Sequence, residues 1–426
     1  MDMTDEQNVK RTTSWLLFFI ILILGYLISV FQDLHYVYLA ALVAVIGFVI
    51  RYRNYFIRIQ RSLFRVFIGT IFIFSGFVKG VDPVGTQYRI EDYFIAFGTE
   101  WAMPLALPLS VILNTFEFIL GVMILFKIWM NLTSWLLLIM MSVFTLVTIN
   151  DALYNPVPDC GCFGDALIIT NWQTLYKNLV IDAMLIPVFA ARKKTIRLFS
   201  PATGTVVFLL TLAVFVWFQV YSIRHLPVID FRNWKVGKKL TISDPEPVQY
   251  YLTYRNKETG EEKEYLSPNY PYDDSTWLAK WEFVSQRVVD PNPRLHNLSI
   301  EDAEGNNYTK DVIENPGYQF MLVSYNLKKG NFKKIDEIRS FIDACDQNGV
   351  AFEVITASLP SAIEKFKEKH NLDADFYLAD DITLMAMIRS NPGLILLRDA
   401  VVIDKWHHND FPDFSDILKR FPEMGQ

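Results

Sequence analysis

Two of the chain's three cysteines stand one residue apart, in the segment Asp159-Cys160-Gly161-Cys162-Phe163-Gly164-Asp165. Two thiols at this spacing can exchange a disulfide, form a static disulfide or contribute to a metal site. A disulfide across one intervening residue closes a small, strained ring, and strain makes a disulfide labile. The spacing therefore favours thiol–disulfide exchange, with Cys160 and Cys162 as the catalytic residues.

The residues around the pair bear on the two alternatives. A metal site needs further ligands, and no histidine stands between Asp151 and Trp172, so no metal is predicted. Asp159 and Asp165 would raise the pKa of a nearby thiol and slow its attack, but aspartates in such positions also cap turns. A static disulfide that pins the loop stays open as an alternative.

The pair lies between long apolar stretches that must position it. Hydrophobic residues make up 52% of the 426-residue chain. In the first half they gather in blocks of about 18–20 residues with almost no charge, the length of a membrane-crossing helix. Backbone polar groups within lipid must be paired internally, so each block is predicted to be a helix. Seven candidate spans cover about residues 13–31, 36–50, 62–80, 104–126, 131–150, 173–191 and 204–222.

The first of these spans is predicted to be retained. The apolar run from Trp15 to Phe31 is longer than the core of a signal peptide, and no small-x-small cleavage site follows it.

Basic residues alternate between the connections of the spans. They stand before the first span and in the second, fourth and sixth connections, whereas the other connections are poor in them. Cytoplasmic loops carry the excess of basic residues, so the N-terminus is expected in the cytoplasm and the cysteine pair on the outer face, with everything after Tyr221. We therefore expect a bacterial inner-membrane protein with a periplasmic C-terminal region, in a compartment where disulfides persist. The basic residues are Lys10, Arg11, Arg51, Arg53, Arg58, Arg61, Lys127, Arg192, Lys193, Lys194 and Arg197.

Three ionisable residues lie within or at the end of apolar spans, where charge is costly and often functional. Glu117 is in the middle of the fourth span, Asp182 is in the sixth, and Lys79 closes the third. One interpretation is a proton path that serves a membrane quinone. The alternative is pairing between helices, for example of Glu117 with Arg65.

A soluble region of about 200 residues follows the last span. In its first part, residues 250–254 and 264–266 predict a β-hairpin closed at Thr259-Gly260, before prolines that mark a linker or subdomain boundary. The formal net charge is −6, and no basic stripe alternates with aromatic residues, so nucleic acid is not an expected partner.

From about residue 296 the pattern becomes α/β. Alternating strands and helices predict a largely parallel sheet with an antiparallel pair at its end, around a turn at Arg398-Asp399. Cys345 is predicted to be a buried hydrophobic residue. His407 and His408 should point to opposite faces of a strand. The expected strands are 318–325, 351–356, 376–378, 394–397 and 401–406, and the expected helices are 335–348, 361–369 and 382–389.

Two stretches of the membrane half resemble one family. The pattern Arg65-x-Phe67-x-Gly69-x-x-Phe72-x-x-Ser75-Gly76-x-x-Lys79, followed by Asp82-Pro83-x-Gly85, resembles the first span and loop of the DoxX family. The Cys-Gly-Cys-Phe-Gly loop resembles the MauE branch of that group. The resemblance covers about residues 60–195 and implies a four-helix unit with membrane redox work: quinone-linked sulfur oxidation in one branch, maturation of a disulfide-rich partner in the MauE branch.

The C-terminal part, about residues 296–426, resembles a thioredoxin-like domain. Pro392, just before the terminal hairpin, is at the position of the cis-proline of that fold. The active pair of such a domain would follow the first strand, near Tyr325-Asn326-Leu327-Lys328, where no cysteine stands. The resemblance therefore implies a redox-inactive domain that binds a partner, with Pro392 as a partner-binding residue.

The predicted fold class is a membrane all-α helical bundle of about seven spans with a DoxX-like four-helix core, plus a soluble α/β thioredoxin-like domain. The first functional hypothesis is a thiol–disulfide oxidoreductase that is linked to a membrane quinone and acts on an envelope protein. The second is a non-enzymatic membrane anchor or assembly scaffold of an envelope complex. The expected domains are 1–61, two spans; 62–195, the DoxX/MauE-like bundle; 196–222, the seventh span; 223–295, a β-rich periplasmic subdomain; and 296–426, the thioredoxin-like domain.

Overall fold

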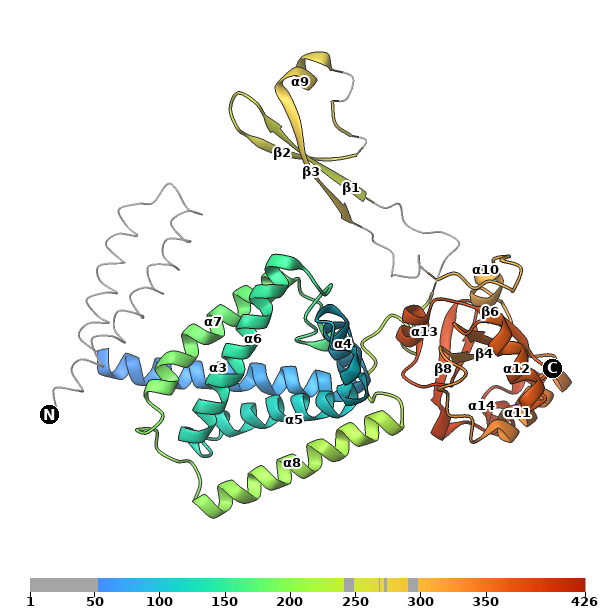
Figure 1. Ribbon diagram of the computed structural model, residues 1–426, viewed down its shortest axis with the longest axis horizontal. Coiled ribbons are helices and arrows are strands. Elements are labelled where there is room, and N and C mark those ends of the chain that lie inside the picture. Colours follow the sequence, from blue (N-terminus) through green and yellow to red (C-terminus); the bar gives the residue numbers. More distant parts are fainter. Residues whose placement is uncertain (1–52, 241–248, 268, 272–273, 290–297, 426) are drawn as a thin grey trace. The chain divides into compact units, whose positions relative to one another are not determined.

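The computed structural model describes residues 53–240, 249–267, 269–271, 274–289 and 298–425, in two compact units that meet in the sequence between Val220 and Tyr221 (Figure 1). The predicted spans 13–31 and 36–50 lie outside the described residues.

Helices build the first unit. Within the described part of the chain, four stretches are long and apolar enough to cross a membrane: 57–81, 100–125, 130–154 and 201–224. They confirm the third, fourth, fifth and seventh predicted spans as apolar helices. The helices are α3 (Arg53–Val81), α4 (Pro83–Ala96), η1 (Glu100–Leu105), α5 (Ala106–Leu125), α6 (Met130–Tyr154), η2 (Gly164–Ala166), α7 (Asn171–Ala190) and α8 (Pro201–Arg224).

The sixth predicted span corresponds to α7, which is helical but is not among those four stretches. Its first half is polar, with Gln173, Thr174, Lys177 and Asn178, and this dilutes the apolar run.

α3 begins earlier than expected. The segment with Arg58 and Arg61 was predicted to be a connection, but both residues belong to the first turns of α3. Helix propensity explains the difference, because arginine is a good helix former and nothing in this segment interrupts a helix.

α4 occupies a segment that was expected to be a connection. The Asp82 side chain accepts a hydrogen bond from the Gly85 amide at 2.9 Å, and Pro83 takes the first helical position. An N-cap aspartate followed by proline is a readable helix start. The start of α4 could therefore have been predicted from the sequence.

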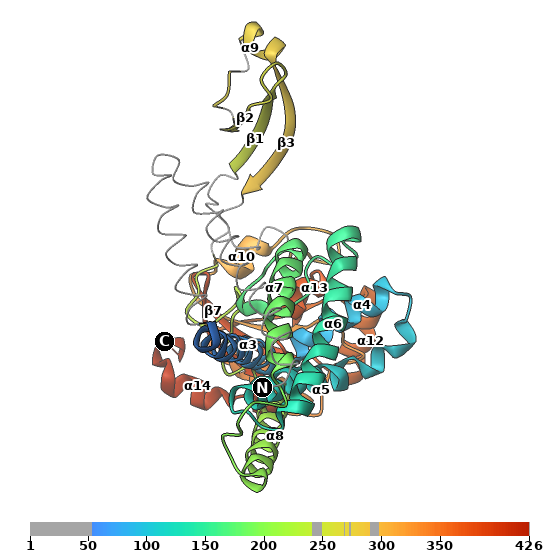
Figure 2. The ribbon, with the colours of Figure 1, turned by 90° about the vertical axis from the view of Figure 1, so that its left-hand side faces the viewer.

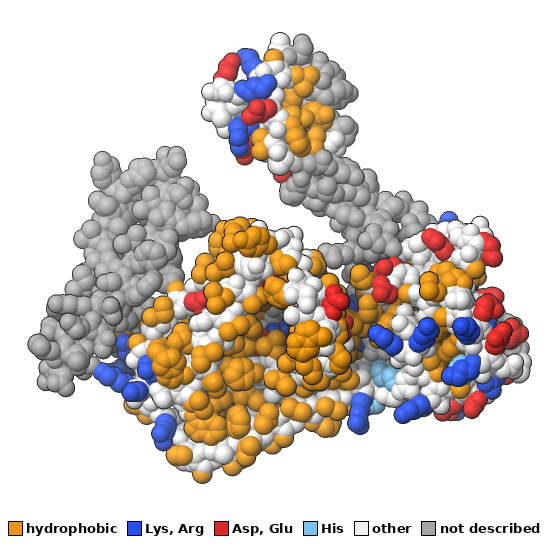
Figure 3. All heavy atoms as spheres, in the orientation of Figure 1, with side chains coloured by type: hydrophobic (Ala, Val, Ile, Leu, Met, Phe, Trp, Pro, Cys, Tyr) orange, Lys and Arg blue, Asp and Glu red, His pale blue; other side chains and the backbone are white. Residues whose placement is uncertain are grey.

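The core of the first unit lies between α3, α5, α6 and α7, where Ile68, Phe72, Leu120 and Leu185 are among the buried residues. α8 packs on α5 through Phe215, whose ring stacks on that of Phe118 at 4.1 Å. Hydrophobic side chains cover most of this unit in the space-filling view, as a lipid-facing surface requires (Figure 3).

A three-stranded antiparallel sheet with the order β2-β1-β3 lies in the second unit (Figure 2). The predicted hairpin is confirmed, with Arg255 opposite Glu262 and Gly260 in the left-handed region at φ +72°. The third strand was not predicted. The elements are β1 (Gln249–Asn256), β2 (Glu262–Leu266), α9 (Ser275–Lys280) and β3 (Trp281–Val289).

A five-stranded sheet with the order β6-β5-β4-β7-β8 forms the rest of the second unit. β4, β5 and β6 are parallel, whereas β7 and β8 are antiparallel, as predicted. The strands are β4 (Tyr318–Ser324), β5 (Ala351–Thr356), β6 (Asp375–Leu378), β7 (Gly393–Arg398) and β8 (Val401–His407); the helices are α10 (Thr309–Ile313), α11 (Ile335–Gln347), α12 (Pro360–His370), α13 (Asp381–Met387) and α14 (Phe414–Arg420), with η4 (His408–Asp410) and η5 (Pro422–Gly425).

Alternation along the strands places helices on both faces of this sheet. Phe320 and Leu322 pack with residues of α11, α12 and α14, whereas Met321 and Val323 pack with residues of α10 and α13. Cys345 is fully buried in the first of these cores, as predicted.

Two local predictions in this domain were wrong. The β7–β8 turn is centred on Asp399 and Ala400, which both have positive φ, one residue later than expected. His407 and His408 do not diverge: their ring centroids lie 4.0 Å apart, because β8 ends at His407 and the chain turns into η4.

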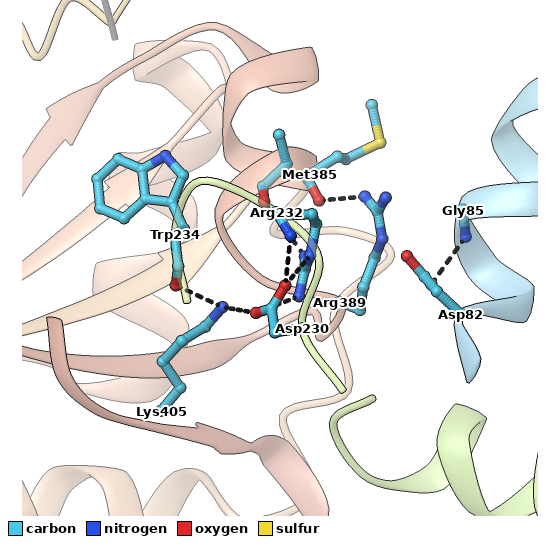
Figure 4. Close-up of polar contacts among 9 residues, drawn as sticks. Asp82, Gly85, Asp230, Arg232, Trp234, Met385, Arg389 and Lys405 are labelled. Atoms are coloured by element: carbon cyan, nitrogen blue, oxygen red, sulfur yellow. Dashed lines mark hydrogen bonds and ion pairs between the residues drawn. The ribbon is translucent and has the colours of Figure 1, made fainter. Parts of the chain in front are cut away.

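A buried ionic cluster fastens the start of the second unit to β8 (Figure 4). Asp230 accepts hydrogen bonds from Arg232 at 2.8 Å and from Lys405 at 2.9 Å, and Lys405 also donates to the Trp234 carbonyl at 3.1 Å. Burial would raise the pKa of Asp230, but the two cations outweigh it and lower that pKa to about 2.

Candidate functional site

The cysteine segment is a short loop between α6 and α7 whose ends are fixed by hydrogen bonds. Thr170 and Gln173 form a capping box at the start of α7. The Asn171 amide donates to Asn155 Oδ1 at 2.7 Å and to the Val157 carbonyl at 2.9 Å. The loop therefore leaves one helix and enters the next along a defined path.

The structure brings the two predicted catalytic cysteines together as free thiols, each partly exposed. Cys160 Sγ donates a hydrogen bond to Thr174 Oγ1 at 3.5 Å, and the two thiols lie close enough to alter each other's pKa. Gly161 between them has φ +62°, and a Cβ there would come within 2.8 Å of the Arg89 side chain. The tight turn thus requires glycine.

Asp159 caps the turn. Its Oδ1 accepts the Gly161 amide at 2.9 Å, and its Oδ2 pairs with Arg89 at 2.7 Å. This is the alternative role that the sequence left open for it. Because Arg89 neutralises the carboxylate, Asp159 is not the charge that opposes the thiolate.

A buried ion pair lies behind the loop. Lys79 Nζ is 2.5 Å from Glu117 Oε1, and the two side chains are only 5% and 2% exposed. Ser75 joins this pair to the loop, since its Oγ is 2.7 Å from Glu117 Oε2 and 2.7 Å from the Cys162 carbonyl oxygen. Two of the ionisable residues singled out in the spans therefore meet each other next to the cysteines.

The suggested partnership of Glu117 with Arg65 was wrong. The Arg65 guanidinium donates to the carbonyl of Ile124 at 3.1 Å and to that of Leu125, at the end of α5. These carbonyls stand in the last turn of α5, where a cation is favourable. Glu117 is paired by Lys79 instead.

The electrostatic setting makes the two thiols unequal. The hydrogen bond from Cys160 lowers the pKa of Cys162 to about 6, against the effect of burial, with help from Lys177 and Lys79 and opposition from Glu117. The same hydrogen bond, together with burial, raises the pKa of Cys160 above its ordinary range. Cys162 is thus the more acidic thiol of the pair.

Asp182 lies apart from the ion pair. It accepts a hydrogen bond from Thr145 at 2.7 Å. One turn of α7 closer to the cysteines, Asn178 donates to Thr148 at 3.2 Å, and one turn further Thr174 reaches Cys160. These three residues of α7 form a polar line between α6 and α7, but no hydrogen bond between described residues connects Asp182 with Glu117.

The comparisons with known proteins bear on this same segment. Residues 53–191 match the family model described as methylamine utilisation protein MauE. The matched segment runs from α3 to the end of α7 and includes the cysteine loop, Lys79 and Glu117, but it is less than half of the chain. A search of curated proteins found no match.

The match supports a MauE-like membrane protein, and together with the apolar helices it supports a membrane location. The second unit lies outside the matched residues. The resemblance drawn from the Cys-Gly-Cys-Phe-Gly loop and the Ser75-Gly76-x-x-Lys79 pattern is therefore confirmed at this level.

Pro392 lies between α13 and β7, after a cis Asn391–Pro392 peptide bond. The Asn391 side chain donates to the Asn326 carbonyl at 3.0 Å and accepts from Ser324 Oγ at 2.7 Å. Through Asn391, the chain at Pro392 is thus joined to the segment that follows β4.

Sequence reasoning missed Ser75, Arg89, Thr174 and Lys177 as part of the site. A signal existed for Ser75, because Ser75 and Lys79 are four residues apart and so share one face of a helix. For the others, the fold had to bring α4 and α7 to the loop before their role was visible.

Proposed function

We propose that this protein is a membrane-bound thiol–disulfide oxidoreductase whose Cys160–Cys162 pair donates a disulfide to a client protein. The observation that carries the proposal is a glycine turn that holds two unequal free thiols together, with the pKa of Cys162 lowered and that of Cys160 raised. Thiolate stabilisation favours the reduced state of a pair, so the corresponding disulfide is a good oxidant. The strained ring of a disulfide across one residue acts in the same direction.

The reaction begins with the pair as a disulfide. A client thiolate attacks Cys160 Sγ, the Cys160–Cys162 bond breaks, and Cys162 leaves as the thiolate, since the sulfur of lower pKa leaves faster. The second client thiol then attacks the client sulfur of the mixed disulfide. A client disulfide forms, Cys160 is released and takes up the proton of that thiol. Two electrons pass from the client to the pair.

Reoxidation of the pair requires a second electron acceptor, and a membrane quinone is the class that the DoxX resemblance implies. Of the hydrogen-bond donors inside the bundle beside the pair, the Ser75 hydroxyl is already bound to Glu117, whereas the Lys79 ammonium has three N–H groups and contacts Glu117 through one hydrogen bond.

The second unit would hold the client. The strand order β6-β5-β4-β7-β8, with parallel β4 and β5 and a cis-proline before β7, supports a thioredoxin-like domain. Because no cysteine stands near Tyr325-Asn326-Leu327-Lys328, where the resemblance places a redox pair, binding rather than exchange is its proposed role, with Pro392 in the binding region. The distribution of basic residues supports the proposal that this unit and the cysteine loop lie on the periplasmic side of a bacterial inner membrane.

The matched family is described as methylamine utilisation protein MauE, and the resemblance to the MauE branch implies a role in the maturation of a disulfide-rich partner. On this proposal the client is an envelope protein that needs a disulfide. The alternative is a membrane anchor or assembly scaffold in which the pair is a permanent disulfide, and the absence of a cysteine pair near Tyr325-Asn326-Leu327-Lys328 favours it.

Trapping the redox state in intact cells separates these functions. Thiols are quenched with acid and tagged by mass, with and without mild external reductant. We expect a mixture of dithiol and disulfide in the unmodified chain. A Cys162→Ser variant cannot form the internal disulfide, but its Cys160 thiolate can attack the disulfide of an oxidised client, the reverse of the last step, and the resulting covalent adduct should accumulate because Cys162 is not there to release it. The matched Cys160→Ser variant should trap less, because the mixed disulfide of the reaction forms on Cys160. A pair that is fully oxidised, resists reductant and traps nothing would leave the anchor as the function.

A further inference from the structure

The ion pair behind the cysteine loop is unusual because both of its charged side chains are buried. Buried ion pairs add little to stability on their own, because desolvation offsets the attraction between the charges. Lys79 and Glu117 nevertheless lie almost fully buried on two neighbouring helices. Ser75 joins Glu117 to the Cys162 carbonyl oxygen, so the pair lies directly behind this residue, and its two charges act on the Cys162 thiol with opposite signs.

The charges that surround Cys162 can be assigned element by element. On α4, Arg89 is paired with Asp159 and Asp92, and Tyr93 donates to Asp151 of α6 at 2.6 Å. Asp165 of η2 also has a partner. The charges that act on the Cys162 sulfur are Lys79 of α3, Glu117 of α5 and Lys177 of α7, with the Cys160 thiol beside it.

The charges of this set sum to zero in only one state of the cysteine pair. Two lysines face one carboxylate, so one positive charge is left over while Cys162 is a thiol or part of a disulfide. The thiolate cancels it. Low-dielectric surroundings strengthen such an imbalance, so the oxidised pair presents uncompensated positive charge to an incoming client thiolate.

We propose that Lys79 and Glu117 are opposed positioning residues for the exchange reaction: Lys79 favours the Cys162 thiolate, Glu117 limits it, and Ser75 fixes the Cys162 backbone against the pair. The inference rests on the proposed function, since it concerns the same cysteines. Glu117 thereby prevents the pair from being held permanently reduced, while Lys79 keeps Cys162 a good leaving group.

The contact through Ser75 distinguishes this arrangement from a pair that only packs two helices. Ser75 lies one helical turn before Lys79 on α3, and its hydroxyl reaches both Glu117 and the loop backbone at 2.7 Å. A change in the position of Glu117 is therefore transmitted to the residue that reacts.

The test is the pH dependence of alkylation of Cys162 in the reduced, full-length protein in detergent, read by peptide mass spectrometry. Glu117→Gln should shift the midpoint down by about one pH unit and Lys79→Gln should shift it up by about one unit. The double variant should return close to the midpoint of the unmodified chain. Asp182→Asn serves as the matched control, because it neutralises another bundle carboxylate that lies away from the pair, and its midpoint should not move.

Loss of packing would move both single variants in the same direction, and that result, or no shift in either, would overturn the inference. If Lys79→Gln does not fold, Glu117→Gln and Ser75→Ala still decide it: the first must lower the midpoint, and the second must alter the alkylation rate of Cys162 while leaving that of Cys345 in the denatured chain unchanged. Opposite shifts without any client adduct in cells would sustain the electrostatic control and reject the exchange function. A client adduct in cells without any shift of the midpoints would support the exchange function and reject the electrostatic control.

Discussion

Gly76 of α3 is the position at which the site depends most directly on helix packing. A Cβ on Gly76 would lie 2.6 Å from the Phe118 amide nitrogen and 2.8 Å from its Cα. Both are backbone atoms of α5, so no side-chain rotation relieves the contact. The glycine allows α3 and α5 to approach closely, and Glu117 precedes Phe118 on α5.

Gly76→Ala should therefore separate the two helices. Reaching an ordinary contact of 3.4 Å from 2.6 Å requires a shift of roughly 0.8 Å, and overpacking of this kind costs about 1–3 kcal/mol. The same shift would lengthen the bonds from Glu117 to Lys79 and Ser75, now 2.5 Å and 2.7 Å, beyond good hydrogen-bond distance. We expect lower stability and a changed alkylation rate of Cys162.

Gly204→Ala is the matched control. It makes the same substitution in the apolar helix α8, where the nearest atom to a new Cβ is Ile128 Cγ2 at 3.5 Å, an ordinary contact. Alanine within a helix is favoured over glycine by about 0.5–1 kcal/mol, so this variant should be neutral or slightly stabilised. Thermal unfolding in detergent and Cys162 alkylation compare the two. Equal stability and equal alkylation in both variants would refute the argument that the α3–α5 crossing sets the site.

Three further predictions follow from the electrostatics. Cys160→Ala removes the hydrogen bond that lowers the pKa of Cys162 to about 6, so its alkylation at pH 7 should slow by roughly tenfold or more; an unchanged rate would show that the lysines suffice. Burial raises the pKa of Glu353 to about 7 from an ordinary value of 4.5, so ionisation destabilises the fold as pH rises through that window; Glu353→Gln should remove up to about 3 kcal/mol of this loss, measured by denaturant unfolding at pH 5 and 8. Asp230→Asn leaves the buried Lys405 without its carboxylate and should cost about 3–5 kcal/mol, part of it recovered by adding Lys405→Met; a smaller loss in the same unfolding assay would mean that water reaches the cluster.

Much of the fold could be predicted because it follows from local patterns. The apolar run of α8 and the strand Ala351–Thr356 are recognisable from composition and length alone. The helix α4 was also within reach, because Asp82-Pro83 is a cap followed by a first-turn proline. It was missed because its residues are too polar for a span and the segment was interpreted only by its charge.

The site could be predicted only in part. The spacing of Cys160 and Cys162 predicted a candidate pair, and the cost of burying charge drew attention to Lys79 and Glu117. That these two meet depends on the crossing of α3 and α5, which no local pattern encodes. Arg65 was an equally reasonable partner for Glu117 by distance along the chain, and only the geometry shows that it caps the end of α5 instead.

The Ser75 hydroxyl has one hydrogen and lies at the same distance from two acceptors, the Glu117 carboxylate and the Cys162 carbonyl. If one acceptor moves away, the hydroxyl donates only to the other. The loop carbonyl and the buried carboxylate therefore compete for one hydrogen bond, and by thermodynamic reciprocity a displacement of either one changes the hydrogen bond of the other. A client that pulls the loop outward would strengthen the hydrogen bond from Ser75 to Glu117. Client binding at the loop would therefore change the bonding of a buried carboxylate without any movement of a helix.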